Sequence, residues 1–218
     1  IFLTEHIGLE KDRLWVTIFW WYYDDNWNEI IPYDKHAEDI LLNLWISKEK
    51  ILPIKMYKWK KCDNFRWPAW EIWPCGPCAE FHYDRGEWRW PNNRDMQNNS
   101  RYVEIRNNVF MDLYKDKEWI FTKMKNHNID TWMWLWRMLM VINNKESVYE
   151  TDIFSDFIKH LEIITDKEYA AFNKYSFNQN KSEQSTVSSM RIIADHFRAS
   201  VFLLWDWVTP SNEWRWYI

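Results

Sequence analysis

The chain carries 19 tryptophans and only 3 glycines in 218 residues, and this imbalance constrains its fold more than any other feature of the sequence. An average glycine content of about 7% corresponds to roughly 15 residues in a chain of this length. Folded chains need glycine at turns and helix ends, because a Cβ atom strains left-handed backbone. Trp27 and Trp119 stand in turn-like segments and Trp45 follows a helical pattern, all positions where glycine is expected.

The segment NIDTWMWLWRMLMVI, residues 128–142, concentrates this feature. As an alternating strand it would place Trp132, Trp134 and Trp136 on one face and a methionine and a leucine on the other. Both faces of such a strand would be apolar. Neither face would then be suited to water.

Composition narrows the class of protein. The length favours one domain with its own core. A net charge of -4, from 28 basic and 32 acidic residues, provides no basic surface typical of a self-sufficient nucleic-acid binder. Three cysteines make no disulfide framework, and the sequence shows neither a signal peptide nor a membrane-length apolar run. These features predict a reducing, cytoplasmic setting.

The apolar periodicity predicts one mixed α+β domain. Alternating apolar residues predict strands, and apolar residues spaced three and four apart predict helices. The predicted extended segments are 14–19, 51–57, 101–114 and 128–131. The predicted helices are 35–44, 137–142, 151–165 with Thr151 or Asp152 as N-cap, and a buried helix at 189–204. Two loops are expected, a proline-rich one from Asp63 to Gly86 and a polar one at about 173–189.

A series of segments carries a family resemblance. The segments are, in chain order, LWVTIF, DNF, EIWPCGPCAEFHYDRG, RYVEIRNNVFM, NIDTWMWLWR, RIIADHFRAS and DWVTPSNEWRWY. In order and spacing they resemble the catalytic domain of the alanyl-tRNA synthetases, a class II synthetase family, from about Phe2 to Tyr217. The resemblance implies a class II antiparallel sheet flanked by helices.

The resemblance also implies that residues 1–218 form a fragment of the aminoacylation domain. Motifs 1 and 2 of the class are expected to precede it, so the sheet is expected to be incomplete at its N-terminal side. The tRNA-recognition helices, the editing domain and the C-terminal domain are expected to be absent. Because motif 2 supplies an arginine for the α-phosphate, we expect the fragment alone to be inactive.

The resemblance gives the tryptophans a simple interpretation. Tryptophan stands where the family has glycine; these positions are Trp73, Trp132, Trp134, Trp207 and Trp216. We hypothesise that most of the tryptophans are misdecoded glycines, since UGA encodes glycine in some bacterial codes and tryptophan in others. Trp15, in LWVT, matches a true family tryptophan. A truly tryptophan-rich or designed chain is the alternative.

The implied activity is an aminoacyl-tRNA ligase that uses ATP and Mg²⁺. Alanine and ATP would form alanyl-adenylate and pyrophosphate, and the alanyl group would pass to the 3′ end of tRNA(Ala). The alternative is a non-catalytic, synthetase-like binding or regulatory paralogue. No DNA and no membrane partner is expected.

Five residues of the central segments match site positions of the family. The motif 3 arginine, Arg137, would bind the ATP phosphates and act in catalysis. Asp130 would hold the substrate α-ammonium, with Asn107 beside it, and Trp132 stands on a glycine of the amino-acid pocket. Glu104 would reach ATP or Mg²⁺, although an alternating strand turns it away from Asn107 unless a bulge intervenes. Without a functional role, these would be a surface arginine, a turn aspartate and a half-exposed asparagine.

Other positions depart from the family or extend its site. Arg106 and Arg66 stand where the family commonly has aromatic residues, which changes the expected shape of the amino-acid pocket. Asn212 and Arg215 lie near the start of the family's acceptor-stem surface, and we expect them to contact tRNA.

The cysteines also allow the hypothesis of a metal site. Cys62, Cys75, Cys78 and His82 form a C-x12-C-x2-C-x3-H pattern, which is a possible zinc set. The family uses the PCGPC segment as a loop near the active site, and its zinc belongs to the editing domain. We therefore expect no zinc in this segment.

The coding DNA tests the decoding hypothesis directly. We expect UGG at codon 15 and UGA at most of the other tryptophan codons. Sequencing of the gene with its flanks provides the measurement. UGG at every tryptophan codon would contradict the hypothesis.

Overall fold

The computed structural model describes residues 1–23, 29–54, 63–67, 73–86, 101–118, 120–169 and 181–211. The chain divides into two units, Ile1–Met138 and Leu139–Ile218, and each is described by itself. Several positions named above lie outside the described residues: Trp27, Cys62, Trp119, Asn212, Arg215 and Trp216.

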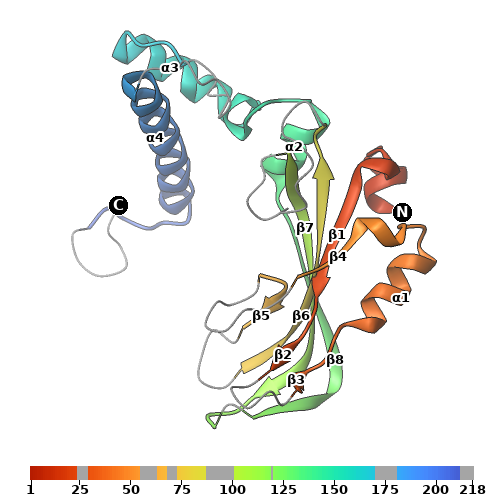
Figure 1. Cartoon of the computed structure of the whole chain (residues 1–218). Helices are drawn as coiled ribbons and strands as arrows, with labels where there is room; N and C mark the ends of the chain where they lie inside the picture. The colour runs from red at the N-terminus through yellow and green to blue at the C-terminus, as the bar shows by residue number, and fades with distance from the viewer. Residues whose placement is uncertain are drawn as a thin grey trace. The chain divides into compact units, whose positions relative to one another are not determined.

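The first unit is built on a six-stranded sheet (Figure 1). Its strands are β1 (Leu14–Phe19), β4 (Ile51–Ile54), β5 (Phe65–Arg66), β6 (Trp73–Asp84), β7 (Tyr102–Lys115) and β8 (Phe121–Met133). The order is β4-β1-β6-β7-β8, with β5 added to β6. Only the β1–β4 pair is parallel among the strand pairs described. A separate pair, β2 (Tyr22–Tyr23) and β3 (Glu29–Ile31), is antiparallel. The predicted α+β class is confirmed.

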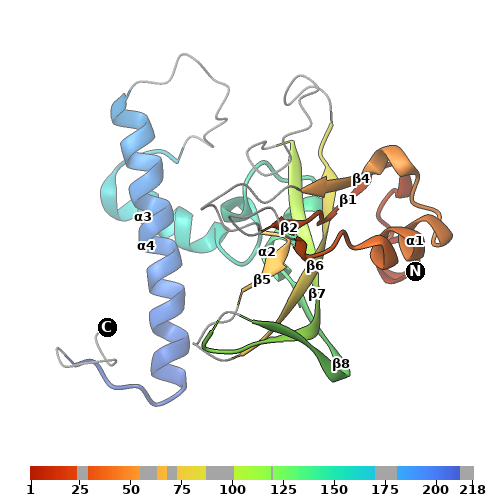
Figure 2. The same cartoon turned by 60° about the horizontal axis from the view of Figure 1, so that its bottom comes forward.

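Helix α1 (Lys35–Asn43) covers one face of this sheet, here called the α1 face. Asp34 begins the helix as N-cap, since its carboxylate accepts a hydrogen bond from the backbone N–H of Ala37 at 3.0 Å. Leu41 packs with Val16 and Ile18 of β1 in one buried cluster. Burying such a side chain stabilises the fold by about 1.5–3 kcal/mol. In both views α1 and β5 lie on opposite sides of the sheet (Figure 2).

The other face of the sheet, here called the site face, carries polar side chains. Alternation along β1 turns Thr17 away from the α1 cluster, and Thr17 pairs with Glu80 of β6. Both residues are buried. A polar, buried floor therefore lies back to back with the apolar α1 face.

The prediction of a proline-rich loop from Asp63 to Gly86 is wrong, because β6 occupies half of it and β5 lies within it as well. The strand pairs with β1 on one side and with β7 on the other, so its backbone groups are satisfied within the sheet. Gly76 makes this possible: a Cβ there would lie 1.8 Å from the carbonyl oxygen of Phe110. The strand shifts register between Cys75 and Cys78, where the glycine and a proline are accommodated.

Helix α2 (Leu135–Ile142) follows β8 directly. The alternation proposed for the tryptophans of this segment therefore ends early, because Trp132 is in the strand, Trp134 lies between the elements and Trp136 is helical. The predicted helix at 137–142 is confirmed. Single-turn helices complete the described elements: Phe2–His6, Lys11–Arg13, Lys48–Lys50 and Val148–Glu150.

The second unit contains α3 (Ser155–Thr165) and α4 (Lys181–Trp205). The rings of Phe157 and Phe197 meet at 5.0 Å between the two helices. The predicted N-cap of α3 is wrong: Phe154 precedes the helix, and the hydroxyl of Thr151 instead donates to the carbonyl of Val148 at 2.6 Å. That hydrogen bond closes the preceding single turn.

The boundaries and burial predicted for α4 are also wrong. The helix begins at Lys181, so 181–189 of the predicted polar loop is helical, and the earlier part of that loop lies outside the described residues. The predicted buried helix exposes much of its apolar surface, with Phe202 57% and Trp205 82% exposed. Apolar residues lie around most of the helix, and burial of all of them requires neighbours on every side. No helix in the described part of the chain is both long and apolar enough to cross a membrane.

Two tryptophans adopt the left-handed backbone that favours glycine. Trp45 has φ 87° and Trp207 has φ 61°. After α1, the N–H of Trp45 donates to the carbonyl of Leu42 at 3.2 Å, and the next N–H, from Ile46, donates to Leu41 at 3.1 Å. This pair of hydrogen bonds is the Schellman motif, whose left-handed residue is usually glycine.

The end of α4 repeats this geometry. The N–H of Trp207 donates to Leu204 at 3.1 Å, and that of Val208 donates to Leu203 at 2.9 Å. The other non-glycine residues with positive φ in the described chain are an asparagine and an aspartate, which tolerate this conformation. Both helix ends therefore support the hypothesis that glycine belongs at these two tryptophan positions.

Replacing either tryptophan with glycine should stabilise its unit. Trp45→Gly and Trp207→Gly each remove a left-handed strain of about 1–2 kcal/mol, partly offset by the entropy of the unfolded chain. We expect a gain of about 1 kcal/mol for each in urea unfolding followed by circular dichroism. Trp15→Gly is the control: Trp15 lies in β1 with its ring 5.5 Å from that of Tyr102, so its loss should destabilise the chain. A loss of stability in both helix-end variants would contradict the glycine assignment.

Candidate functional site

A β-bulge in β7 brings Glu104 to the site face. Phe81 of β6 pairs with Arg106, but the next residue, His82, pairs with Glu104, so β7 has one extra residue at Ile105. A strand without this bulge would turn Glu104 and Asn107 to opposite faces. With the extra residue, both lie on the site face. Simple alternation would have turned Glu104 away from Asn107, and the bulge instead places both side chains on one face.

Arg137 is anchored to Glu104. Its Nη1 lies 2.9 Å from Oε2 of Glu104 and also donates to the backbone carbonyl of Glu104 at 3.1 Å. Arg137 stands in the first turn of α2, immediately after β8. Its guanidinium carbon lies 4.7 Å from the centre of the Trp134 ring. Two contacts to β7 and one to Trp134 hold the cation at the end of the sheet, whereas an ordinary surface arginine would project into solvent.

Asp130 and Trp132 follow each other on the site face of β8. Trp132 pairs with Asn107, and Asp130 pairs with the residue two positions further along β7. The indole N–H of Trp132 donates to Oδ2 of Asp130 at 3.0 Å. Nη1 of Arg66 lies 3.9 Å from the same oxygen. The carboxylate expected to hold an ammonium group therefore already contacts an indole and a guanidinium.

Asn107 presents one half of its amide to β6. Its Nδ2 donates to Oε1 of Glu80 at 3.1 Å. Its Oδ1 is buried and has no hydrogen-bond partner among the described atoms. An unpaired buried acceptor costs about 1–3 kcal/mol, so this oxygen is suited to a donor supplied by a ligand.

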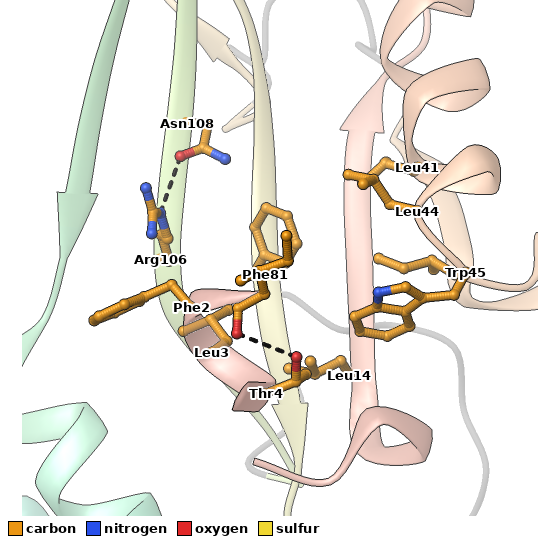
Figure 3. Close-up of a pocket in the computed structure, with 12 residues that line it drawn as sticks. Phe2, Leu3, Thr4, Leu14, Leu41, Leu44, Trp45, Phe81, Arg106 and Asn108 are labelled. Atoms are coloured by element: carbon orange, nitrogen blue, oxygen red, sulfur yellow. Dashed lines mark hydrogen bonds between the residues drawn. The ribbon is translucent and has the colours of Figure 1, made fainter. Parts of the chain in front are cut away.

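Arg106 lies on the opposite side of the sheet from these residues. It lines a pocket of about 200 Å³ between the sheet, α1 and the N-terminal residues, together with Phe81 and Asn108 (Figure 3). Its Nε donates to Oδ1 of Asn108 at 3.1 Å and to Oγ1 of Thr131 at 3.2 Å. Arg106 is therefore turned away from Asp130 and Asn107, because successive strand residues face opposite ways. Arg66, by contrast, does lie beside Asp130.

The cysteines have the surroundings of core residues. Cys75 packs with Phe19, Ile31 and Phe65. Burial, and secondarily the negative charge of Asp112, raises the pKa of the Cys75 thiol to about 11. A zinc ligand is a thiolate, which this environment disfavours. Within the described ranges no group of three or more His, Cys, Asp or Glu side chains converges as a metal site would require.

The geometry combines binding groups for opposite charges on one face. Arg137 provides a positive charge at a helix start, where phosphate oxygens bind well. Asp130 and the free amide oxygen of Asn107 provide acceptors for an ammonium group. Glu104 lies between these groups along β7 and offers a carboxylate to a cation. The site therefore fits a ligand with an ammonium end and a phosphate end.

An antiparallel sheet with these groups on one face, flanked by helices, defines the catalytic domain of a class II aminoacyl-tRNA synthetase. The profile of the family described as tRNA synthetases class II (A) matches residues 1–218. The chain belongs to this family.

Three curated relatives define the resemblance more closely. The chain is 31% identical over 219 residues to the alanine–tRNA ligase of Acidithiobacillus ferridurans. It is 32% identical over 222 residues to that of Clostridioides difficile (strain 630) and 32% identical over 219 residues to that of Hydrogenovibrio crunogenus. Each match covers 100% of this chain and 22% of the length of the relative. The chain thus spans about a fifth of the length of these relatives.

The structure adds polar residues that the sequence does not single out, together with His82, which the sequence indicates only as a possible zinc ligand. Thr17, Asn64, Glu80 and His82 are buried on the site face and contact one another. The signal available in the sequence was weak: Glu80 and His82 are polar residues at alternate positions of CAEFHYD. The proline content of the segment predicts a loop, so this alternation does not lead to a strand prediction.

Cys75 should resist alkylation in the folded chain. A pKa of about 11 leaves on the order of one thiol in a thousand ionised at pH 8, and only the thiolate reacts. We expect iodoacetamide to label Cys75 in native protein at least about 100-fold more slowly than in urea, with labelling accelerating as the pH rises from 8 to 10. Mass spectrometry of tryptic peptides gives the rate for each cysteine. Labelling of native Cys75 as fast as in urea would show that the thiol is not buried.

Proposed function

We propose that this chain is part of the catalytic domain of an alanine–tRNA ligase. In this reaction alanine and ATP form alanyl-adenylate and pyrophosphate, and the alanyl group then passes to the 3′ end of tRNA(Ala). The family membership and the similarity to three alanine–tRNA ligases support the proposal. The observation that carries it is the convergence of Arg137, Glu104, Asp130 and Asn107 on one face of the sheet.

The amino acid would bind between β7 and β8. Asp130 neutralises the α-ammonium group, and Oδ1 of Asn107 accepts one of its hydrogens. The two residues are diagonal neighbours on paired strands, at about 7–8 Å, which leaves room for an ammonium group between two acceptors. A glycine at position 132 would give the small alanine side chain the space that the indole of Trp132 now occupies.

ATP would bind with its phosphates towards Arg137. A carboxylate oxygen of alanine attacks the α-phosphorus and pyrophosphate leaves, so negative charge on the departing group increases. Arg137 stabilises that charge, and its two contacts with Glu104 fix its position in advance. Catalysis by these residues is therefore mainly positioning and electrostatic stabilisation.

Glu104 fits a role in holding Mg²⁺. Arg137 hydrogen-bonds to Oε2, which leaves Oε1 for a cation among the described contacts. Mg²⁺ is usually bound by one or two carboxylates together with substrate phosphates. The ion would supply charge neutralisation on those phosphates.

Two expected tRNA-contacting residues lie outside the described residues. Asn212 and Arg215 would contact the acceptor end of tRNA(Ala), as the family resemblance implies. A cytoplasmic location follows from a role in translation. We propose no DNA partner.

A second candidate is a non-catalytic, synthetase-like protein. The hydrogen bond from the indole of Trp132 to Asp130 favours it, because a true tryptophan there competes with the substrate ammonium for the same carboxylate. The codon at position 132 separates the two proposals. A tryptophan codon favours the non-catalytic protein, and a glycine codon favours the ligase.

Alanine-dependent ATP–pyrophosphate exchange tests the ligase. The assay uses the gene product that contains this chain, with glycine at 132 and 134. We expect exchange with alanine, and Arg137→Gln should reduce kcat/KM by about 100-fold or more, because it removes a charge that stabilises the leaving group. Tryptophan retained at 132 should abolish exchange.

Lys159→Gln provides the matched control, because Lys159 lies on α3 and pairs only with the exposed Asp156 in the described contacts. Its exchange rate should equal that of the parent. Exchange by Arg137→Gln at the parent rate would contradict the role of Arg137. Absence of alanine-dependent exchange in the parent with both glycines would contradict the proposed ligase.

A further inference from the structure

A buried chain of polar side chains lies beneath Asn107. Thr17, Asn64 and Glu80 come from β1, the turn before β5, and β6, and all are at most 6% exposed. Burial of polar groups is unfavourable unless they are hydrogen-bonded. The three side chains are hydrogen-bonded to one another, and among their polar atoms Oδ1 of Asn64 is buried without a partner in the described part of the chain.

The shorter hydrogen bonds of this chain run towards Glu80; at 3.4 Å, Nδ2 of Asn64 also donates to the carbonyl of Cys78, and Oγ1 of Thr17 also contacts Nε2 of His82. Nδ2 of Asn64 donates to Oγ1 of Thr17 at 2.8 Å, and Thr17 donates to Oε2 of Glu80 at 3.1 Å. From the other side, Nδ2 of Asn107 donates to Oε1 of Glu80 at 3.1 Å. A carboxylate only accepts hydrogen bonds. Each oxygen of Glu80 therefore has a donor that holds it in place.

This arrangement decides which way the amide of Asn107 points. The two ends of an asparagine amide are nearly identical in shape, so packing alone does not select between them. Glu80 accepts and cannot donate, so it selects the orientation with Nδ2 towards itself. Oδ1 must then point away from Glu80, and it has no partner among the described atoms.

We propose that Glu80 is a positioning residue of the active site. It acts through Asn107: by holding the amide NH₂, it presents the amide oxygen to the α-ammonium group of the amino acid. Thr17 in turn fixes the carboxylate of Glu80. This proposal rests on the proposed ligase function and extends it to a residue that does not touch the substrate.

The same residues do not fit a metal site. His82 is the nearest other candidate ligand, with Nε2 3.5 Å from Oε2 of Glu80. Among the described residues no third His, Cys, Asp or Glu joins them as a set that could hold a metal ion. The donors that hydrogen-bond to Glu80 are a hydroxyl and an amide group, which fit an orienting role.

Glu80→Gln tests the proposal with almost no change in side-chain volume. A glutamine can donate to Oδ1 of Asn107 as well as accept from Nδ2, so the amide loses its fixed orientation. In the gene product with glycine at 132 and 134, we expect KM for alanine in pyrophosphate exchange to rise about tenfold, the effect of one misdirected hydrogen bond to a charged group. KM for ATP should change less than twofold. An unchanged KM for alanine would overturn the proposal.

The double variant separates orientation from general structural damage. Asn107→Asp places an acceptor on both ends of the side chain, so its orientation no longer matters, but it also sets a second carboxylate against that of Glu80. Glu80→Gln should therefore raise KM for alanine in the asparagine background and lower it in the Asn107→Asp background, because the glutamine amide can donate to the new carboxylate and the charge repulsion is lost. An equal rise in both backgrounds would show that Glu80 has only a structural role and would overturn the proposal.

Controls keep the result interpretable. Glu49→Gln, an exposed position outside the site, should match the parent. If Glu80→Gln does not fold, as judged by thermal unfolding, Thr17→Val gives a second measurement: it removes the donor to Oε2 and should raise KM for alanine about threefold. An unchanged KM in a folded Thr17→Val variant would then overturn the proposal. If the parent protein shows no alanine-dependent exchange, the ligase function itself is contradicted. If the parent is active and Glu80→Gln leaves KM for alanine unchanged, only the positioning role of Glu80 is contradicted.

Discussion

The extra residue in β7 at Ile105 is the constraint on which the site depends. Without it, Glu104 would turn to the α1 face and Arg137 would lose the carboxylate that now pairs with it. The bulge places Glu104 and Asn107 on the same side of the strand although they are three positions apart. One irregularity in strand pairing thus brings Arg137, Glu104 and Asn107 to the same face. Pairing resumes on both sides of the bulge.

The α1 face of the sheet contributes apolar burial, and the site face carries the polar groups of the candidate site. On the α1 face, Val16, Ile18 and Leu41 bury apolar surface. On the site face, Glu80 and Asn107 are held by hydrogen bonds, which fix directions better than apolar contacts do. A site built on a rigid sheet keeps its groups in place before the ligand arrives.

The tryptophans disturb this arrangement where glycine geometry is required. Trp45 and Trp207 end helices in the left-handed conformation, and the indole of Trp132 binds the carboxylate of Asp130. Two of these effects concern backbone conformation and one concerns the site. All three follow from the presence of a bulky side chain where the family has, or the chain geometry favours, a residue without Cβ.

The sequence by itself determined the family, the α+β class, the helix at α1, the strands β1 and β7, and the matching of Arg137, Asp130 and Asn107 to site positions, because these rest on local periodicity and on motifs close in the chain. Only the tertiary structure decided that β6 is a central strand, that α4 begins at Lys181, that Arg106 faces α1 and that Glu80 orients Asn107. Those outcomes depend on pairing between distant segments. The effect of a bulge or of a buried carboxylate depends on the residue that faces it on the adjacent strand. The periodicity of one strand does not predict which residue that is.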